Sequence, residues 1–124
     1  MSSAEAAPRA DREPARAIGQ LRRRPTVDLS VALCTWNGER WIRPFLESLA
    51  GQHHLPDELV VQDDDSSDDT VALVRALAPT LPFEVRLEVN SRRVGSTANF
   101  GLALERCRGR FVALADQDDV WYPE

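Results

Sequence analysis

The C-terminal part of the chain carries the side chains best suited to bind a metal ion. The stretch FVALADQDDVWYPE, residues 111–124, places Asp116, Asp118 and Asp119 directly after an apolar run. Carboxylates at Asp-x-Asp spacing are hard oxygen ligands that suit Mg²⁺ or Mn²⁺. Such an ion is usually held by one or two protein carboxylates together with phosphate oxygens of a substrate. The pattern therefore indicates a divalent cation and a phosphorylated ligand.

A second acidic stretch follows an earlier apolar run. ELVVQ, residues 58–62, leads into Asp63, Asp64 and Asp65. Two acidic loops that meet in one crevice repel each other unless a cation lies between them. Two further apolar runs are followed by polar or planar side chains: Thr35, Trp36, Asn37 and Glu39 after the first, and Asn90, Arg92, Arg93 and Gly95 after the third. Trp36 could pack on a planar base, and the two arginines could meet phosphate charge.

Hydrophobic patterning predicts the elements that must position these residues. Short apolar or β-branched runs predict four strands, at residues 28–35, 58–62, 83–89 and 110–115. Helical periodicity predicts three helices between them: one from about residues 40–42 to Gly51, one capped by Ser67 or Asp68, and one from about Ser96 to Gly109. The run at 83–89 alternates with period two, so this strand should lie at or near a sheet edge.

The first two helices are predicted to bury apolar faces. The residues on these faces are Trp41, Ile42, Phe45, Leu46 and Leu49 in the first helix, and Val71, Val74, Leu77 and Ala78 in the second. Proline lacks the N–H that a helix interior requires. We therefore expect Pro44 to lie in the first turn of its helix.

The resulting order, β-α-β-α-β-α-β, predicts an α/β fold of Rossmann-like form with a largely parallel sheet and right-handed crossovers. In such sheets, ligands bind in the crevice at the carboxyl ends of the strands. All the polar groups described above follow strand ends, so they should meet at this edge. We expect one domain with this fold over residues 26–124.

Composition and charge restrict the class of protein. Hydrophobic residues make up 43% and charged residues 28%, as in an ordinary globular domain, and the net charge of −5 argues against binding nucleic acid. No apolar run reaches the ~18 residues that span a bilayer, and no secretory signal is present, so we expect a cytoplasmic location. Residues 1–25, rich in Arg, Ala and Pro, are predicted to be a disordered tail. The arginines at 22–24 leave peripheral association with the inner face of a membrane open.

The remaining potential metal ligands are predicted to be structural. Cys34 and Cys107 match no metal-binding spacing, and we expect two reduced, partly buried thiols. His53 and His54 have no His or Cys partner at ligand spacing. The glycine motifs of dinucleotide-binding and P-loop proteins are absent after the first strand, and residues 63–74 lack the glycine and glutamate of an EF-hand loop.

Four blocks, in order, resemble family 2 glycosyltransferases of the GT-A fold: VALCTWNGERWIRPFLESLAGQ, ELVVQDDDSSDDT, NSRRVGSTANFGLAL and FVALADQDDVWYP. The resemblance covers about residues 28–124 and points to the rhamnosyltransferase-like branch. It implies the donor-binding half of a metal-dependent enzyme that transfers a sugar from a dTDP- or UDP-linked donor to an acceptor hydroxyl, with inversion, in cell-surface polysaccharide or glycan synthesis. The catalytic base would lie beyond Glu124, so the chain would be a fragment that is inactive alone.

The same resemblance implies which residues bind the donor. Nucleotide contacts are expected from Thr35, Trp36, Asn37, Glu39, Asp64, Asn90, Gly95, Asn99 and Asp116. Asp64 would recognise the base, and Asp118, with Asp116 beside it, would contact Mg²⁺ or Mn²⁺. Asp65 replaces a glycine of the family's Asp-Asp-Gly-Ser block, so we expect it in a left-handed conformation. Asp119 would support the metal-binding turn or cap a helix.

Two other functions remain open. FVALADQDDV also fits the first block of haloacid-dehalogenase-like phosphatases, with Asp116 as nucleophile and Asp118 as acid/base, but the lysine of that family would have to follow Glu124. A phospho-accepting receiver domain is excluded because it also uses a lysine, and all fifteen basic residues are arginine. Alternatively, the chain is a non-catalytic nucleotide-binding remnant or subunit. In either glycosyltransferase-like case, an uncovered fourth strand would leave apolar surface exposed.

Overall fold

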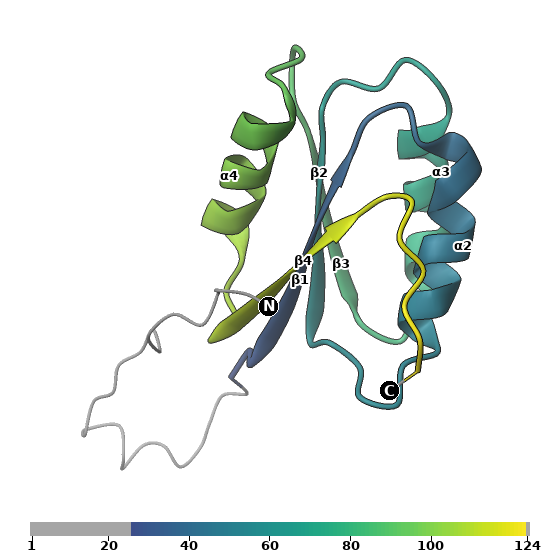
Figure 1. The fold of residues 1–124 in the computed structure, drawn as a ribbon, viewed down its shortest axis with the longest axis vertical. Helices are drawn as coiled ribbons and strands as arrows, with labels where there is room; N and C mark the ends of the chain where they lie inside the picture. The colour runs from purple at the N-terminus through teal and green to yellow at the C-terminus, as the bar shows by residue number, and fades with distance from the viewer. Residues whose placement is uncertain (1–25, 124) are drawn as a thin grey trace.

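Four strands form one sheet in the order β3-β2-β1-β4, and every neighbouring pair is parallel. The computed structural model describes residues 26–123. The strands are β1 (Leu29–Thr35), β2 (Glu58–Asp63), β3 (Glu84–Val89) and β4 (Phe111–Asp116). Figure 1 shows the sheet with its helices on both sides. The predicted α/β fold with a parallel sheet is confirmed.

The two inner strands are buried along nearly their whole length. In β1 only Leu29 is partly exposed, and in β2 every residue is buried. An inner strand of a parallel sheet is covered on both faces, which is why continuous apolar runs occupy these two positions. β3 and β4 are the edge strands and are partly exposed. The predicted edge position of residues 83–89 is therefore confirmed.

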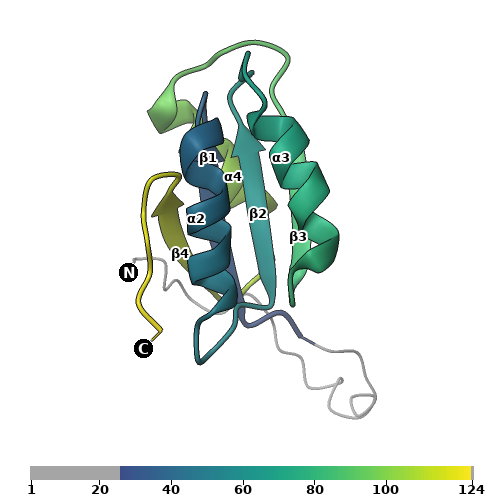
Figure 2. The ribbon, with the colours of Figure 1, turned by 90° about the vertical axis from the view of Figure 1, so that its right-hand side faces the viewer.

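Helices cover both faces of the sheet, as the two ribbon views show (Figures 1 and 2). On one face lie α2 (Glu39–Ala50) and α3 (Thr70–Leu77), the latter followed by the 3₁₀ turn η2 (Ala78–Thr80), and on the other face lies α4 (Ser96–Arg106). The core on the α2 and α3 side is formed by Val31, Leu33, Ile42, Phe45, Leu46, Leu49, Leu59, Val61, Val74 and Ala115. The core beneath α4 is smaller and consists of Ala32, Cys34, Val60, Ala103, Cys107 and Val112.

Helix α2 differs from the prediction in its first turn. It begins at Glu39, because the Gly38 carbonyl already accepts a hydrogen bond from the backbone N–H of Trp41. Pro44 consequently lies in the second turn, on the exposed side of the helix, and not in the first. Trp41 is 40% exposed, with the Arg40 guanidinium over its ring, so the prediction that it belongs to the buried face was wrong.

Helix α3 begins later than predicted. Its first residue is Thr70, and neither Ser67 nor Asp68 caps it, because both belong to the preceding loop. The backbone N–H of Ser67 donates to Asn37 Oδ1 at 2.8 Å, which ties the loop to the turn after β1. Asp68 Oδ1 accepts the Thr70 N–H at 2.9 Å, which fixes the approach of the chain to the helix.

Helix α4 ends at Arg106, earlier than the predicted end at Gly109. Cys107 is already extended, with φ −72° and ψ 138°. Gly109 is needed for another reason: its N–H donates to the Ser30 hydroxyl at 2.9 Å. A Cβ at this position would lie 2.7 Å from the Ser30 backbone nitrogen. The glycine therefore permits close contact with β1 and does not cap the helix.

The segment after β4 folds back along α2, as Figure 1 shows in yellow. Trp121 packs edge-on against Phe45, with ring centroids 6.0 Å apart, and the backbone N–H of Trp121 donates to the Ser48 hydroxyl at 3.0 Å. Within residues 26–123, the outer edge of β4 pairs with no other strand. Phe111 and Leu114 are 43% and 48% exposed, which confirms the predicted apolar surface at the fourth strand.

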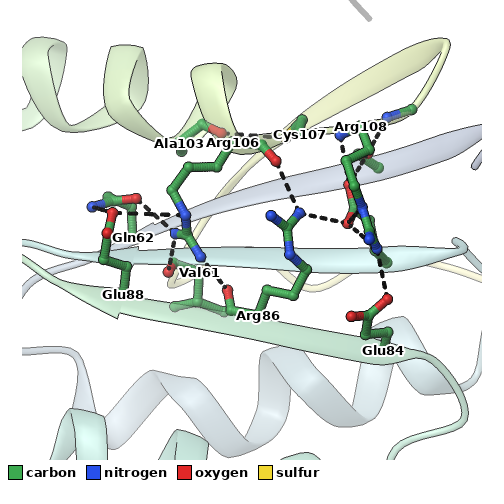
Figure 3. Close-up of polar contacts among 12 residues, drawn as sticks. Val61, Gln62, Glu84, Arg86, Glu88, Ala103, Arg106, Cys107 and Arg108 are labelled. Atoms are coloured by element: carbon green, nitrogen blue, oxygen red, sulfur yellow. Dashed lines mark hydrogen bonds and ion pairs between the residues drawn. The ribbon is translucent and has the colours of Figure 1, made fainter.

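A network of ion pairs links α4 to the β2–β3 side of the sheet (Figure 3). Glu58, at the start of β2, is fully buried and accepts hydrogen bonds from Arg86 Nη1 at 2.8 Å and Arg108 Nε at 3.0 Å. Its other oxygen accepts the Ser30 hydroxyl at 2.6 Å and the Arg108 N–H at 2.8 Å. Burial acts to raise the pKa of Glu58, but these donors hold it below its ordinary value.

The network continues along β2 toward the carboxyl edge of the sheet. Arg106, in the last turn of α4, donates through Nη1 to Gln62 Oε1 at 2.7 Å and to the Val61 carbonyl at 3.1 Å (Figure 3). Gln62 Nε2 in turn donates to Glu88 at 3.0 Å and to Asn90 Oδ1 at 2.8 Å. Polar side chains therefore connect the buried start of β2 to the loop after β3.

Three further predictions concern features of the whole chain. No helix within the described residues combines the length and the apolar character that crossing a bilayer requires. Cys34 and Cys107 are free and buried, as predicted. The predicted N-terminal tail, residues 1–25, lies outside the described residues.

Candidate nucleotide-binding site

A cavity of about 360 Å³ opens at the carboxyl edge of the sheet, beside the start of α4. This volume is within the range of small-molecule sites in proteins. Six predicted site residues line it: Thr35, Trp36, Asp64, Asn99, Asp116 and Asp118. The ends of β1, β2 and β4 therefore meet around one space, as expected for a ligand crevice in a parallel sheet.

Asp64 follows β2 directly, and its carboxylate holds the loop after β3 in place. Oδ1 accepts hydrogen bonds from the Val94 N–H at 2.8 Å and from Asn90 Nδ2 at 2.9 Å. Oδ2 accepts the Gly95 N–H at 2.9 Å and lies 3.5 Å from Arg93 Nε. Burial acts to raise the pKa of Asp64, but these donors keep it below its ordinary value. A buried, ionised carboxylate thus lines one side of the cavity.

The loop after β3 meets α4 at Gly95, whose φ of 95° is disfavoured for residues with a side chain. In this conformation its N–H reaches Asp64. Asn99, buried in the first turns of α4, donates through Nδ2 to the Gln62 carbonyl at 2.9 Å. Its Oδ1 accepts a hydrogen bond from Asn90 Nδ2 at 2.7 Å. The amide side chains at 90 and 99 therefore fix the loop and the helix to the end of β2.

The turn after β1 is joined to the acidic loop after β2. Asn37 has a φ of 47°, and its N–H donates to the Ser66 hydroxyl at 2.8 Å. Its Oδ1 accepts the Ser67 N–H at 2.8 Å. Asp65 has a φ of 63°, which confirms the left-handed conformation predicted for it. The two loops therefore form one hydrogen-bonded unit.

Side-chain contacts at Thr35 and Glu39 strengthen this unit. The Thr35 hydroxyl donates to the buried Asp63 carboxylate. Glu39 Oε1 accepts the Asp69 N–H at 3.0 Å. Asn37, Glu39, Asn90 and Gly95, which the resemblance placed at the nucleotide, hold the loops together and do not line the cavity themselves.

Trp36 forms a wall of the cavity and is 41% exposed. The Arg93 guanidinium lies 3.6 Å from the centroid of its ring, in cation–π contact. The backbone of Trp36 is bound by a side chain from the opposite turn: its N–H donates to Gln117 Oε1 at 2.9 Å, and its carbonyl accepts Gln117 Nε2 at 3.0 Å. The indole is thus positioned from two sides.

The acidic turn after β4 forms the opposite wall. Asp119 stabilises the turn, because its carboxylate accepts the Asp116 N–H at 3.0 Å and its own N–H donates to the Asp116 carbonyl at 3.0 Å. Asp116 and Asp118 line the cavity. The pKa of Asp116 is raised, first by its partial removal from water and then by the charges of Asp119 and Asp118. Uncompensated negative charge of this kind favours a bound cation.

The donor set present fits a divalent ion only with further ligands. Within residues 26–123, no cluster of three or more His, Cys, Asp or Glu side chains could hold a metal ion. Two carboxylates of this turn, Asp116 and Asp118, line the cavity together. Mg²⁺ commonly binds through one or two carboxylates and completes its shell with water and substrate phosphate oxygens. The residues therefore fit a metal ion that a phosphorylated ligand helps to coordinate.

Five cavity residues were not among the predicted nucleotide contacts: Cys34, Arg93, Ser96, Phe100 and Gln117. Ser96 and Phe100 are four residues apart on α4, near Asn99, so helical spacing alone places them on the same side of the helix. Burial, followed by the charges of Asp116 and Asp64, raises the pKa of the Cys34 thiol to about 12, so it remains protonated.

The chain is similar in sequence to known glycosyltransferases. A sequence model described as Glycosyl transferase family 2 matches residues 30–124. The poly(ribitol-phosphate) beta-N-acetylglucosaminyltransferase TarS of Staphylococcus aureus is 39% identical over 96 residues, covering 75% of this chain and 16% of TarS. The UDP-Glc:alpha-D-GlcNAc-diphosphoundecaprenol beta-1,3-glucosyltransferase WfgD of Escherichia coli is 32% identical over 93 residues, covering 75% of this chain and 36% of WfgD. The chain thus spans well under half the length of these relatives.

Solved structures show the same relationship. The crystal structure of S. aureus TarS 1–349 in complex with UDP-GlcNAc matches with a TM-score of 0.72 at 31% identity, covering 78% of this chain and 28% of that chain. The mannosyltransferase PcManGT from Pyrobaculum calidifontis, in complex with GDP-Man and Mn²⁺, matches with a TM-score of 0.71 at 27% identity, covering 86% and 34%. The fold is therefore the Rossmann-like nucleotide-binding half of GT-A enzymes. The family match includes the Asp116–Asp119 turn, which favours a glycosyltransferase over a phosphatase.

Proposed function

The chain belongs to glycosyl transferase family 2, and we propose that residues 26–124 form the donor-binding half of a metal-dependent enzyme that uses a nucleotide-diphosphate sugar. One observation carries the proposal: a single cavity joins Trp36 and Asp64 on one side to Asp116 and Asp118 on the other. A nucleotide diphosphate has a planar base at one end and a doubly charged diphosphate at the other. The two walls of the cavity match these two ends in chemistry.

At the base end, Trp36 offers an aromatic face and Asp64 offers a carboxylate that can accept N–H groups of a base. Both Asp64 oxygens already have partners, so a base must take the place of one of them. Arg93 is the weakest of these partners, because it lies 3.5 Å away and its side chain is 51% exposed. We propose that Arg93 gives way when a nucleotide binds and that its charge then faces the diphosphate.

At the diphosphate end, Asp118 with Asp116 would hold Mg²⁺ or Mn²⁺. The metal, when bound, offsets the charge that grows on the leaving diphosphate. Asp119 contributes indirectly, because its carboxylate fixes the Asp116 N–H and thereby the shape of the turn. The support for this assignment is geometric: Asp116 and Asp118 both line the cavity, and partial burial, followed by the charges of Asp119 and Asp118, raises the pKa of Asp116.

We propose that transfer is a single displacement with inversion. The acceptor hydroxyl attacks the anomeric carbon, the bond from that carbon to the diphosphate breaks, and a carboxylate base takes the hydroxyl proton. Each cavity carboxylate within the described residues already has a role in binding the base or the metal. We therefore assign the base to a part of the enzyme outside residues 26–124.

For the donor we propose a UDP- or dTDP-linked sugar, and for the product a cell-surface polysaccharide or glycan. The names of two relatives support this: WfgD uses UDP-Glc on a diphosphoundecaprenol-linked acceptor, and TarS acts on poly(ribitol-phosphate). The PcManGT complex contains GDP-Man, so the base must be established by experiment.

A thermal-shift experiment on the full chain tests the proposal. UDP, dTDP and GDP are each added with and without Mn²⁺. A site filled at a hundred times its Kd adds about 2.7 kcal/mol to the free energy of unfolding, which raises Tm measurably. We expect one nucleotide to stabilise the chain strongly, and only with Mn²⁺. In Asp118→Asn, which keeps the size of the side chain, the Mn²⁺ dependence should disappear.

Three outcomes contradict parts of the proposal. No shift with any nucleotide, in a chain that unfolds cooperatively, would show that the cavity is not a nucleotide site. An equal rise in Tm with and without Mn²⁺ would show that the metal takes no part in nucleotide binding. Binding without sugar transfer, when an acceptor is supplied to the full-length enzyme, would favour the non-catalytic nucleotide-binding subunit.

A further inference from the structure

We propose that Gln117 is a positioning residue that sets the distance between the base-binding end and the metal-binding end of the donor site. This inference rests on the proposed function. Gln117 lies between the two aspartates assigned to the metal, Asp116 and Asp118. Its side chain is not assigned to the metal, because the oxygen and the nitrogen of its carboxamide both form hydrogen bonds with the backbone of Trp36.

The carboxamide of Gln117 continues the pairing of β1 with β4 beyond the ends of the strands. Backbone pairing stops at Cys34 and Asp116. From there the Gln117 side chain accepts the Trp36 N–H at 2.9 Å and donates to the Trp36 carbonyl at 3.0 Å. A primary amide has both the donor and the acceptor that this requires, in fixed geometry. The contact therefore adds one further pair of hydrogen bonds between the two turns, beyond the last paired residues of the strands.

Gly38 leaves the space that the Gln117 carboxamide occupies. A Cβ added at Gly38 would lie 2.2 Å from Gln117 Oε1 and 2.4 Å from its carboxamide carbon. The three nearest atoms to that Cβ all belong to Gln117. Gly38 has φ −108°, which alanine can adopt, so an alanine here would displace the Gln117 carboxamide without straining the backbone.

The two hydrogen bonds of Gln117 are the link between the base-binding turn and the metal-binding turn. On its other side, the turn at residues 36–38 is held by Ser66 and Ser67 in the loop after β2 and by Thr70 at the start of α3. Among the described residues, no other hydrogen bond joins residues 36–38 to residues 116–119. A bound nucleotide diphosphate must reach both turns at once, so their separation determines whether base and metal can be bound together.

This geometry leads to an expected pattern of binding. Without Gln117 the two turns are joined only through the strand pairing that ends at Cys34 and Asp116, so their relative position is less tightly fixed. The base and the metal can then each bind, but less well together. The quantity affected is the coupling factor, which is the affinity for the nucleotide with Mn²⁺ divided by its affinity without Mn²⁺. A purely structural role would lower Tm and leave this factor unchanged.

The test compares the full chain with Gln117→Ala, Gly38→Ala and the double variant. Kd for the best nucleotide is measured by calorimetry with and without Mn²⁺. We expect each single variant to lower the coupling factor about tenfold, as the loss of one or two well-formed hydrogen bonds would. The double variant should behave like Gln117→Ala alone, because the alanine at 38 then meets no carboxamide. Such non-additivity is the signature of direct contact.

Two further variants complete the design. Gln117→Glu keeps the size of the side chain but places an acceptor against the Trp36 carbonyl, so it should lower the factor as much as alanine does. Gln52→Ala is the matched control, because Gln52 Nε2 also donates to a backbone carbonyl, that of Tyr122, but away from the cavity. It should leave the factor unchanged.

The possible results separate the two proposals. If the parent chain binds a nucleotide with Mn²⁺ and Gln117→Ala and Gln117→Glu keep its coupling factor, the positioning role of Gln117 is wrong and the proposed function stands. If Gly38→Ala lowers the coupling factor by the same amount with and without Gln117, the contact between residues 38 and 117 is not the cause of that loss. If the parent binds no nucleotide, the proposed function fails, and the role of Gln117 in it fails as well.

Discussion

Glu58 and Asp64 are two buried acidic residues near opposite ends of β2. Glu58 is 0% exposed and Asp64 is 2% exposed. In both, burial acts to raise the pKa, and hydrogen-bond donors nevertheless hold it below the ordinary value. By burial and by pKa the two carboxylates look alike. Their partners and surroundings differ.

The partners of Glu58 are side chains from several elements, Arg86 on β3, Arg108 after α4 and Ser30 on β1, and they enclose it completely. Asp64 is bound mainly by groups of one loop, and the cavity opens beside it. A buried carboxylate with a shifted pKa therefore does not by itself identify a site. In this protein the open cavity and the acidic turn on its opposite wall are what mark Asp64 as part of the proposed site.

The largest expected effect comes from the closed end of β2. In Glu58→Ala, Arg86 and Arg108 lose their buried partner. We expect the free energy of unfolding to fall by about 3 kcal/mol, at the low end for a broken buried ion pair because both arginines are partly exposed. Urea unfolding at low temperature measures this. Nucleotide affinity of the folded variant should stay within about twofold. A loss of under about 1 kcal/mol would show that the network adds little stability.

The second substitution should have the opposite balance, with a large effect on nucleotide affinity and a small effect on stability. In Asp64→Ala, the Kd for the preferred nucleotide should rise about tenfold or more, which corresponds to about 1.4 kcal/mol, and the ranking of UDP, dTDP and GDP should flatten. The free energy of unfolding should fall by only about 1 kcal/mol, because the groups released belong to a loop that water can reach. Calorimetric titration measures both affinity and ranking.

The exposed neighbour Asp65 provides the control for Asp64. Asparagine tolerates the φ of 63° at this position, so Asp65→Asn should change neither affinity nor stability. An unaltered nucleotide ranking in Asp64→Ala would remove Asp64 from the site and make it, like Glu58, a structural residue only.

The third effect is a dependence of stability on acid pH. Because the pKa of Glu58 is lowered by folding from an ordinary 4.5, its contribution is fully present above that pH and is lost as pH falls through the lowered value. We expect Tm of the parent to fall steadily below about pH 4.5, and we expect a smaller fall over the same pH range in Glu58→Gln. Parallel slopes for the two proteins would contradict this.

The smallest effect concerns the N-terminus. Every residue that lines the cavity lies between Cys34 and Asp118. Deleting residues 2–25 should therefore change nucleotide affinity by less than about twofold, within the range of changes far from a site. Calorimetry of the shortened chain measures this, and a large loss of affinity would assign a binding role to the tail.

Most of the fold could be predicted from the sequence, because short strand-like runs alternate with helical periodicity, an order that favours a parallel sheet covered on both faces. The errors occurred where a single residue has more than one possible role. Gly109 looks like a helix end, but the close approach of Ser30 is what requires it. Trp41 fits the apolar face of α2 by spacing, yet it is half exposed beneath Arg40. Such distinctions depend on tertiary neighbours that spacing does not encode.

The site was predictable in its location and only partly in its detail. Strand ends and acidic spacing predicted that Asp64, Asp116 and Asp118 would share one cavity, and they do. The positioning contact of Gln117 could not be predicted, because glutamine has no spacing rule and its partner is a backbone far away in sequence. The loop-holding role of Asn37 was hidden for the same reason, since its partners follow a different strand.

The outer edge of β4, which pairs with no strand within residues 26–123, could accept an additional strand. A strand that adds to a sheet lies about 5 Å from its neighbour. β4 ends in Asp116, so a strand docked on its outer edge would have one of its ends at the mouth of the cavity. The nucleotide half would not need to change for this to happen. A strand added at this edge would therefore bring its own side chains beside the proposed nucleotide site.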